Sequence, residues 1–439
     1  MNRHSPGARD EDREILRLAV PAFLALVAEP LFLLADSAIV GHLGTAELAG
    51  LGIAGAVLST LISLCIFLAY GTTASVARRI GSGDVAGAVR TGIDGIGLAV
   101  LIGLVITTVG ALTTRSLVAL FGAGDRVADQ AEQYLRIGFL GAVPLLVMLA
   151  ATGILRGLQD TRTPLVVSVV GNAVNVGLNL LLVYGLGLGI GGSALGTVLA
   201  QAASAAVMLV VVDRAARRHG VPRRPSRAGI AGAGRAGVPL LLRTVTLRAS
   251  LLVMTFGATS LGETDLAAMQ LAMTLWTFLA FTLDAIAIAA QAITGRYLGA
   301  GDLDGTRRIT RRMLRWGAWS GVATGIGLAA ASPLLGPVFT SDDRVQDLLT
   351  GVLLVAALAQ PLAGVVFVLD GVLIGAGDGG YLAWAGLVVL VVFAPVAWAA
   401  VTLGGTLVWL WAAFATAFMG GRAVVLLARE RGTAWMTVG

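Results

Sequence analysis

The chain has 439 residues, of which 57% are hydrophobic and only 13% are charged, about half the charged fraction of a soluble globular domain. This balance excludes an ordinary soluble protein and predicts a membrane protein. The formal net charge of +6 does not indicate nucleic-acid binding, because the basic residues lie in short connections between apolar runs. The lone Cys65 excludes an intrachain disulfide and a cysteine metal cluster.

Long apolar runs follow one another along the whole chain. Each is about 20 residues or longer, enough to cross a hydrocarbon core of roughly 30 Å as a helix. We therefore expect an all-α polytopic membrane protein with twelve transmembrane helices. The twelve runs begin near Ile15, Leu48, Val85, Val127, Pro164, Gly191, Ala236, Ala267, Leu314, Val345, Tyr381 and Thr406.

The arginines indicate the orientation of the chain. About 25 of the 31 basic residues, all arginine, fall at the two ends or in the even-numbered connections, as the positive-inside rule requires of cytoplasmic segments. This predicts a multi-pass membrane protein with both termini in the cytoplasm. The arginine-rich stretch 213–229 is expected to be a solvated linker, although it could instead hold anionic lipid headgroups.

An internal repeat divides the chain. The segment RRIGSGDVAGAVR (78–90) resembles GRYLGAGDLDGTRR (295–308), and aligning Asp84 with Asp302 gives a constant offset (302 − 84 = 218). The same offset aligns Gly153, Gly157 and Asp160 with Gly371, Gly375 and Asp378. We expect two six-helix lobes, 1–220 and 221–439, in parallel orientation, an arrangement of transporters that rock one half against the other. A purely structural duplication is the alternative.

Ionisable side chains inside the apolar runs are candidates for a functional site, because burying them in a membrane is costly. Asp36 in the first run aligns with Met254, so this acid belongs to the first half alone. Glu29 precedes it by seven residues, which places both carboxylates on one helix face about 10 Å apart. Glu29 could also be an incidental acid.

The fifth run carries a polar stripe of Asn172, Asn175 and Asn179 at helical spacing. Counted from the helix ends, Asp36 and Asn179 lie at similar depth, beyond the middle of the membrane, and could face one cavity. Asparagines also join membrane helices by hydrogen bonds, so a purely structural role is the alternative. The polar site expected in the first half comprises Glu29, Asn172, Asn175, Asn179 and Thr197.

The second half has its own intramembrane charges. Their depths match in two pairs, so we expect two buried ion pairs, Arg243 with Asp370 and Arg248 with Asp284. These pairs could take part in transport, or they could have a purely structural role. Arg136 in the fourth run could extend toward the interface or pair with Glu132. A phosphate-binding GxxxxGKS loop and a catalytic constellation are both missing from the sequence, so we do not expect an enzyme.

The segments ADSAIVGHLG (35–44), GNAVNVGLN (171–179), FLAFTLDAIAIAAQAITGRYLGAGD (278–302) and VLDGVLIGAGD (368–378) resemble the multidrug and toxic compound extrusion family. The similarity is to its bacterial branch, that of DNA-damage-inducible protein F, and covers nearly the whole chain. It implies a secondary antiporter of the bacterial inner membrane that exports organic cations or other amphipathic toxic compounds. Its partners would be those substrates and membrane lipids, with no nucleic acid, and it would act as a monomer.

The resemblance also assigns roles to residues. Asp36 matches the family's proton-coupling aspartate, Pro21 its helix-bending proline, and Asn175 a polar partner on the fifth helix. Asn179 is a departure, because relatives often carry aspartate there, which argues against a tight Na⁺ site. Asp370 matches an acid implicated in the second lobe, whereas Arg243 and Arg248 occupy the helix in which Na⁺-coupled relatives use glutamate.

These assignments favour a transporter without a cofactor that is coupled to H⁺, with Na⁺ as the alternative coupling ion. We expect Asp36 to take up a proton from outside, and the first helix then to bend or rotate and release the substrate. Proton and substrate would compete for one carboxylate. The alternatives are a Na⁺-coupled multidrug antiporter, a flippase for lipid-linked precursors, or a receptor or scaffold that moves nothing.

Overall fold

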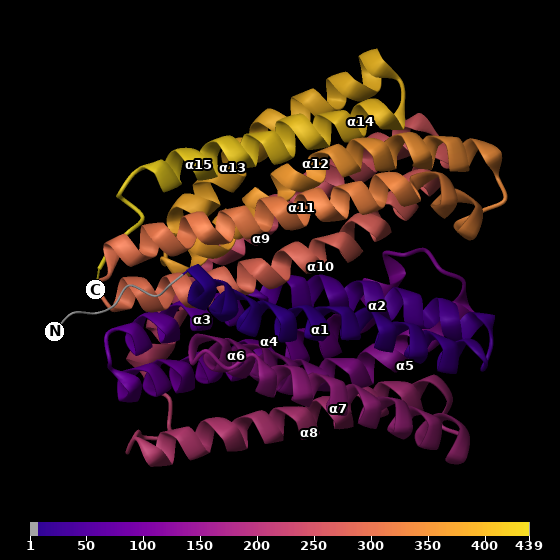
Figure 1. The fold of residues 1–439 in the computed structure, drawn as a ribbon. Coiled ribbons are helices and arrows are strands. Elements are labelled where there is room, and N and C mark those ends of the chain that lie inside the picture. Colours follow the sequence, from indigo (N-terminus) through magenta and orange to yellow (C-terminus); the bar gives the residue numbers. More distant parts are fainter. Residues whose placement is uncertain (1–7, 439) are drawn as a thin grey trace. The chain divides into compact units, whose positions relative to one another are not determined.

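The computed structural model describes residues 8–438 and contains twelve helical segments long and apolar enough to cross a membrane (Figure 1). This confirms the expected all-α architecture. The α-helices are α1 (Ala8–Gly41), α2 (Thr45–Cys65), α3 (Phe67–Gly81), α4 (Val85–Ala119), α5 (Asp125–Gly138), α6 (Ala142–Gly157), α7 (Arg162–Leu180), α8 (Gly189–Arg218), α9 (Arg227–Leu261), α10 (Glu263–Gly299), α11 (Leu303–Phe339), α12 (Asp343–Gly375), α13 (Gly379–Ala399), α14 (Leu407–Ala413) and α15 (Gly421–Arg431).

Short segments of tighter or wider helix complete several spans. A 3₁₀ turn, Phe139–Gly141, joins α5 to α6 within the fourth span. Three π-helical segments, Leu181–Gly185, Ala400–Gly404 and Phe414–Gly420, extend or join α7, α13, α14 and α15. In these spans the backbone thus stays hydrogen-bonded within the helix, as the membrane interior requires.

The chain forms two compact units, each described separately. One is made of residues 24–237 and the other of residues 1–23 together with 238–439. Helices α1 and α9 therefore each contribute to both units. The chain passes from one unit to the other within three residues of Pro21 and within three residues of Pro239. These two prolines are equivalent in the repeat. The lobe division at residues 220 and 221 stays a prediction.

The sequence repeat recurs as a helix contact in both units. A Cβ atom at Gly153 of α6 would lie 2.6 Å from the Ala69 carbonyl oxygen of α3. A Cβ atom at Gly371 of α12 would likewise lie 2.2 Å from the Ala287 carbonyl oxygen of α10. The offset of the repeat relates both members of the first contact to those of the second. Glycine is needed at both positions because no side chain fits between the backbones.

A second repeated feature begins α4 and α11. The carboxylates of Asp84 and Asp302 each accept a hydrogen bond, 2.8 Å long, from a backbone N–H three residues later. The glycine before each has a left-handed backbone, with φ of 82° at Gly83 and 71° at Gly301, which non-glycine residues rarely adopt. The bond from the N–H is also the main reason that the pKa of the Asp84 carboxyl lies below its usual value.

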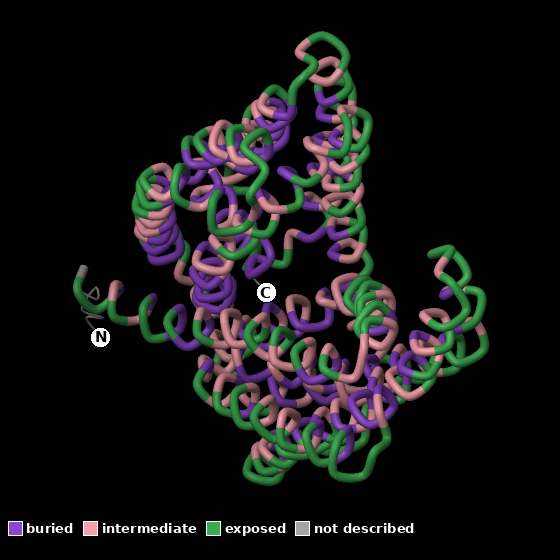
Figure 2. The backbone as a smooth tube through the Cα atoms, turned by 90° about the vertical axis from the view of Figure 1, so that its right-hand side faces the viewer, coloured by how far each residue is buried: buried purple, intermediate pink, exposed green. Residues whose placement is uncertain are grey.

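The surface of the helices is apolar where a membrane would contact it. Figure 2 shows buried residues between neighbouring helices and exposed residues on their outward faces. Large apolar side chains such as Leu112, Leu358 and Leu403 are more than four-fifths exposed. Surface of this kind suits contact with lipid chains rather than water.

Candidate functional site

Asp36 is hydrogen-bonded to two neighbouring helices of the unit formed by residues 24–237. Its Oδ1 atom accepts a bond of 2.6 Å from Asn179 Nδ2 at the end of α7 and one of 2.9 Å from Ser193 Oγ near the start of α8. The C-terminal half of α1 is held further by the Tyr184 hydroxyl, which donates to the Ile39 carbonyl at 2.6 Å. The structure thus brings Asp36 and Asn179 into direct contact.

The asparagine stripe extends this contact along α7. Asn179 Nδ2 also donates to Asn175 Oδ1 at 2.9 Å, and Asn175 Nδ2 donates to Thr197 Oγ1 of α8 at 3.1 Å. The result is a continuous polar chain from Asp36 to Thr197. Asn172 lies one turn away, with its amide 3.5 Å from Ser168 Oγ, and no hydrogen bond among residues 8–438 joins it to that chain.

The close approach of α7 and α8 fixes Asn179. Its side chain is completely buried, and a Cβ atom at Gly196 would lie only 2.1 Å from Asn179 Oδ1. The glycine therefore makes room for the amide against the α8 backbone. Within the described part of the chain, Asn179 Oδ1 has no hydrogen-bond donor, so the amide directs its N–H groups to Asp36 and Asn175.

The surroundings of Asp36 are polar, but its hydrogen-bond partners are uncharged. The donors Asn179 and Ser193 are neutral, and no ion pair to Asp36 occurs among the described residues. Tyr134 of α5 completes the cluster, because its hydroxyl lies beside Ser193 and Thr197 and within reach of the Asp36 charge. A small, mainly apolar pocket of about 50 Å³ adjoins Tyr134 and Thr197.

Two other predicted residues of α1 lie outside this cluster. Glu29 has an exposed side chain, and in the described structure no hydrogen bond or ion pair connects it to Asp36. Pro21 is buried inside α1, which runs as one helix from Ala8 to Gly41. The bend assigned to Pro21 stays a prediction.

The second unit holds a buried charge cluster in which two arginines share one aspartate. Asp370 of α12 accepts hydrogen bonds from Arg243 of α9 and from Arg422 of α15. Asp370 is 6% exposed and Arg422 is 8% exposed. The expected contact between Arg243 and Asp370 is therefore present. Arg422, which was not singled out from the sequence, is an unforeseen member.

The predicted ion pair between Arg248 and Asp284 is wrong for the described structure. Arg248 has an exposed side chain and no ion pair among residues 8–438, whereas the charge of Asp284 acts on Arg422. The physical reason is helical geometry, because Arg248 follows Arg243 by five residues and so points about 140° away around α9. Matching depth does not ensure that two residues face each other.

Other ionic contacts lie closer to the helix ends. Arg136 pairs with Glu132 at 2.9 Å, one of the two possibilities left open for it. Near the start of α1, three acids pair with arginines of α10 and α11 in the same unit. These unforeseen pairs are Glu11 with Arg308, Asp12 with Arg312, and Glu14 with Arg296. The sequence does show an acidic N-terminal segment and an arginine-rich connection between α10 and α11. No sequence rule, however, predicts that these two segments pair.

Two members of the Asp36 cluster were also missed. Ser193 lies in the small-residue run GGSALGT, where a hydroxyl carries no distinctive signal. Tyr134 carries no signal in the sequence that distinguishes it from a core aromatic. Among the described residues, no group of three or more histidine, cysteine, aspartate or glutamate side chains could hold a metal ion.

Comparison with known families gives matches in both halves. A family model described as MatE matches residues 21–181 and 239–424. The first residues of the two matched segments are Pro21 and Pro239, which the internal repeat makes equivalent. The family match therefore follows the duplication of the chain.

Curated relatives cover most of the chain. Protein DETOXIFICATION 44, chloroplastic, from Arabidopsis thaliana is 32% identical over 410 residues, covering 88% of this chain and 76% of the relative. DNA damage-inducible protein F from Escherichia coli is 30% identical over 372 residues, covering 83% and 81%. A crystal structure of a MATE protein in the bent conformation superposes with a TM-score of 0.89 at 23% identity, covering 99% of both chains. The structural match shows the same fold.

Proposed function

Because the chain belongs to the multidrug and toxic compound extrusion (MATE) family, we propose that it exports organic cations or other amphipathic toxic compounds in exchange for protons. It is a multi-pass membrane protein of a multidrug transporter family. The finer proposal is a secondary active antiporter that works by alternating access of two lobes. It needs no cofactor, and H⁺ is its coupling ion.

The observation that carries this proposal is the set of partners around Asp36. The carboxylate receives hydrogen bonds from the neutral groups of Asn179 and Ser193. Because neither donor carries a positive charge, this carboxylate can still be neutralised by a proton or by a cation. Asp370, by contrast, is held between Arg243 and Arg422, so its charge is already compensated.

The same geometry favours protons over sodium. A hard cation prefers several oxygen ligands, but Asn179 presents its Nδ2 group to Asp36, and the Asn175 oxygen accepts a hydrogen bond from that same group. The polar chain that runs from Asp36 through the two asparagines to Thr197 contains a single carboxylate. A proton needs one oxygen atom and no further ligand.

Antiport would follow from competition at Asp36. A proton or a cationic substrate neutralises the carboxylate, whereas the empty and ionised state is costly to carry through the membrane. Each ligand therefore promotes reorientation of the transporter, and the two exclude each other. Protonation of Asp36 would alter the hydrogen bond that it accepts from Asn179. The asparagines of α7 would therefore respond to protonation of Asp36 through Asn179.

The orientation and setting belong to the same proposal. The arginine-rich connections support cytoplasmic termini in a bacterial inner membrane. We further propose that one chain is the working unit, because the Asp36 cluster draws all its residues from α1, α5, α7 and α8 of a single chain.

The test uses purified protein in sealed liposomes loaded with a fluorescent organic cation, with a pH gradient and a Na⁺ gradient imposed separately. Wild type is compared with Asp36→Asn, which removes the titratable group, and with Asp36→Glu, which keeps it. Glu29→Gln is the matched variant, because it removes the other acid of the same helix. We expect flux driven by the pH gradient, abolished in Asp36→Asn and partly kept in Asp36→Glu and Glu29→Gln.

Three results would contradict the proposal. Proton-driven flux that survives Asp36→Asn would place coupling elsewhere. Flux that follows only the Na⁺ gradient would support a Na⁺-coupled antiporter. Transfer of a lipid-linked saccharide across the bilayer, without export of organic cations, would support the flippase alternative.

A further inference from the structure

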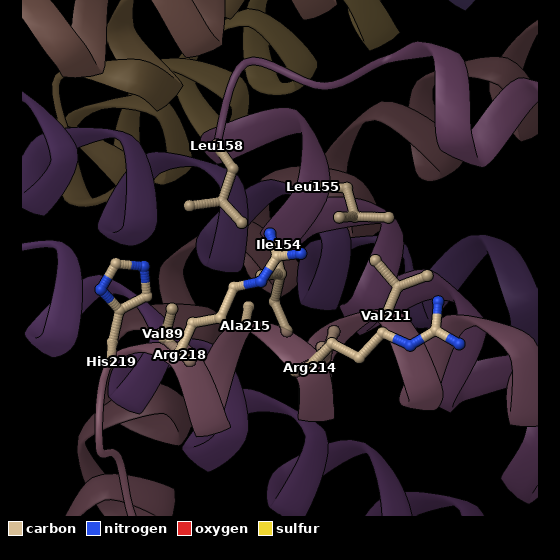
Figure 3. A pocket seen from close by; sticks show the side chains of 10 residues that line it. Val89, Ile154, Leu155, Leu158, Val211, Arg214, Ala215, Arg218 and His219 are labelled. Atoms are coloured by element: carbon tan, nitrogen blue, oxygen red, sulfur yellow. The ribbon is translucent and has the colours of Figure 1, made fainter.

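A cavity of about 310 Å³ lies between α4, α6 and α8, in the unit formed by residues 24–237 and away from Asp36 (Figure 3). Its floor is apolar and includes Val89 of α4 with Ile154 and Leu155 of α6. These three residues belong to a buried apolar cluster. The floor is thus a fixed part of the core, and the cavity lies at its edge.

The rim of this cavity is basic. Arg214, Arg218 and His219 line it at the C-terminal end of α8, and none of the ten residues that line the cavity is acidic. In Figure 3 the Arg218 side chain extends over the floor toward Ile154, between the His219 ring and Arg214. Arg214 and Arg218 are four residues apart, so they lie on one face of the helix.

Neighbouring arginines of the same segment are neutralised, but those of the rim are not. Asp213 forms ion pairs with Arg217 at 2.7 Å and with Arg223 at 2.9 Å. Within residues 8–438 no ion pair is formed by Arg214 or Arg218. Like charges one turn apart repel each other, so an anion between them would be stabilised.

We propose that this cavity binds an anionic phospholipid, with the phosphate at Arg214 and Arg218 and the start of one acyl chain on the apolar floor. Guanidinium groups bind phosphate through paired hydrogen bonds, and His219 adds a third group at the rim. Arg214 and Arg218 directly follow the apolar run 206–212 of α8, so we place them at the depth of lipid headgroups. A free phosphate ion would gain nothing from the apolar floor, whereas an acyl chain would.

The experiment measures lipid binding to the full-length protein in a neutral detergent by native mass spectrometry. The probes are phosphatidylglycerol, phosphatidylcholine and inorganic phosphate. The double variant Arg214→Gln/Arg218→Gln is compared with Arg217→Gln/Arg223→Gln, which removes the same charge from the same segment. We expect the first to bind phosphatidylglycerol roughly 30-fold more weakly and the second to bind it about as wild type does.

A further variant tests the floor. Ala215→Leu narrows the cavity without changing its charge, and we expect it to weaken phosphatidylglycerol binding as well. Equal loss in both double variants would overturn the proposal, because attraction would then depend only on total charge. Equal affinity for phosphatidylcholine would overturn it too, and so would phosphate binding as tightly as phosphatidylglycerol, which would indicate a free anion site.

Discussion

Removing the charge of Asp370 should destabilise the unit formed by residues 1–23 and 238–439. In Asp370→Asn the guanidinium groups of Arg243 and Arg422 remain buried without their shared counter-ion. Breaking a buried ion pair from one side costs about 3–5 kcal/mol. For a unit of this size that corresponds to a fall in melting temperature on the order of 10 °C.

The two units carry separate spectroscopic reporters for this measurement. All eight tryptophans lie between residues 276 and 435, and the single Cys65 lies in the unit formed by residues 24–237. Heating the detergent-solubilised protein while recording tryptophan fluorescence follows the unit with Asp370. The reaction of buried Cys65 with a thiol-specific dye follows the other unit.

The matched control is Asp347→Asn, an exposed aspartate of the same helix, which should change stability by less than about 0.5 kcal/mol. Arg422→Met should cost less than Asp370→Asn, because Arg243 remains with the aspartate. If Asp370→Asn melts with the same tryptophan midpoint as Asp347→Asn, the ion cluster does not stabilise this unit and the electrostatic argument is refuted.

Three further predictions concern packing, helix capping and the linker. Gly371→Ala should cost about 1–3 kcal/mol, because its Cβ would meet a backbone carbonyl at 2.2 Å, whereas Gly380→Ala meets open space and should be neutral in the same melting assay. At neutral pH, Asp84→Asn should lower the melting midpoint of the unit that is followed by the reactivity of Cys65. Since folding depresses the Asp84 pKa, its stabilisation is present above the unfolded pKa of about 3.8 and is lost at lower pH, so the midpoints should converge in acid. Asp94→Ala removes the acceptor for Ser226 N and Oγ, and trypsin should then cut the linker faster; an unchanged rate would show that Asp94 does not hold it.

The sequence predicted the features that depend on local chemistry. Twelve spans followed from apolar length alone, because a membrane-crossing helix needs only enough apolar residues in a row. The repeat followed from a constant offset, and Gly153 and Gly371 confirm it as equivalent close helix contacts. Asp36 stood out because a charge within an apolar run is rare and costly.

The sequence alone could not assign partners across helices. Arg243 and Asp370 were paired correctly by depth, but the same rule failed for Arg248, because depth along a helix says nothing about direction around it. Arg422 was missed because nothing in the sequence shows that this residue of the last span faces Asp370 of α12.

What the sequence determined by itself was the membrane setting, the number of spans, the duplication and the position of Asp36, all of which depend on residue type and order along the chain. Tertiary structure alone decided that Asn179 and Ser193 donate to Asp36 while two arginines compensate Asp370. The reason is physical: hydropathy is a property of each segment, whereas a hydrogen bond depends on the direction and separation of two side chains within a few tenths of an ångström. Those are set by how the helices pack, as the contact of Asn179 with Gly196 shows.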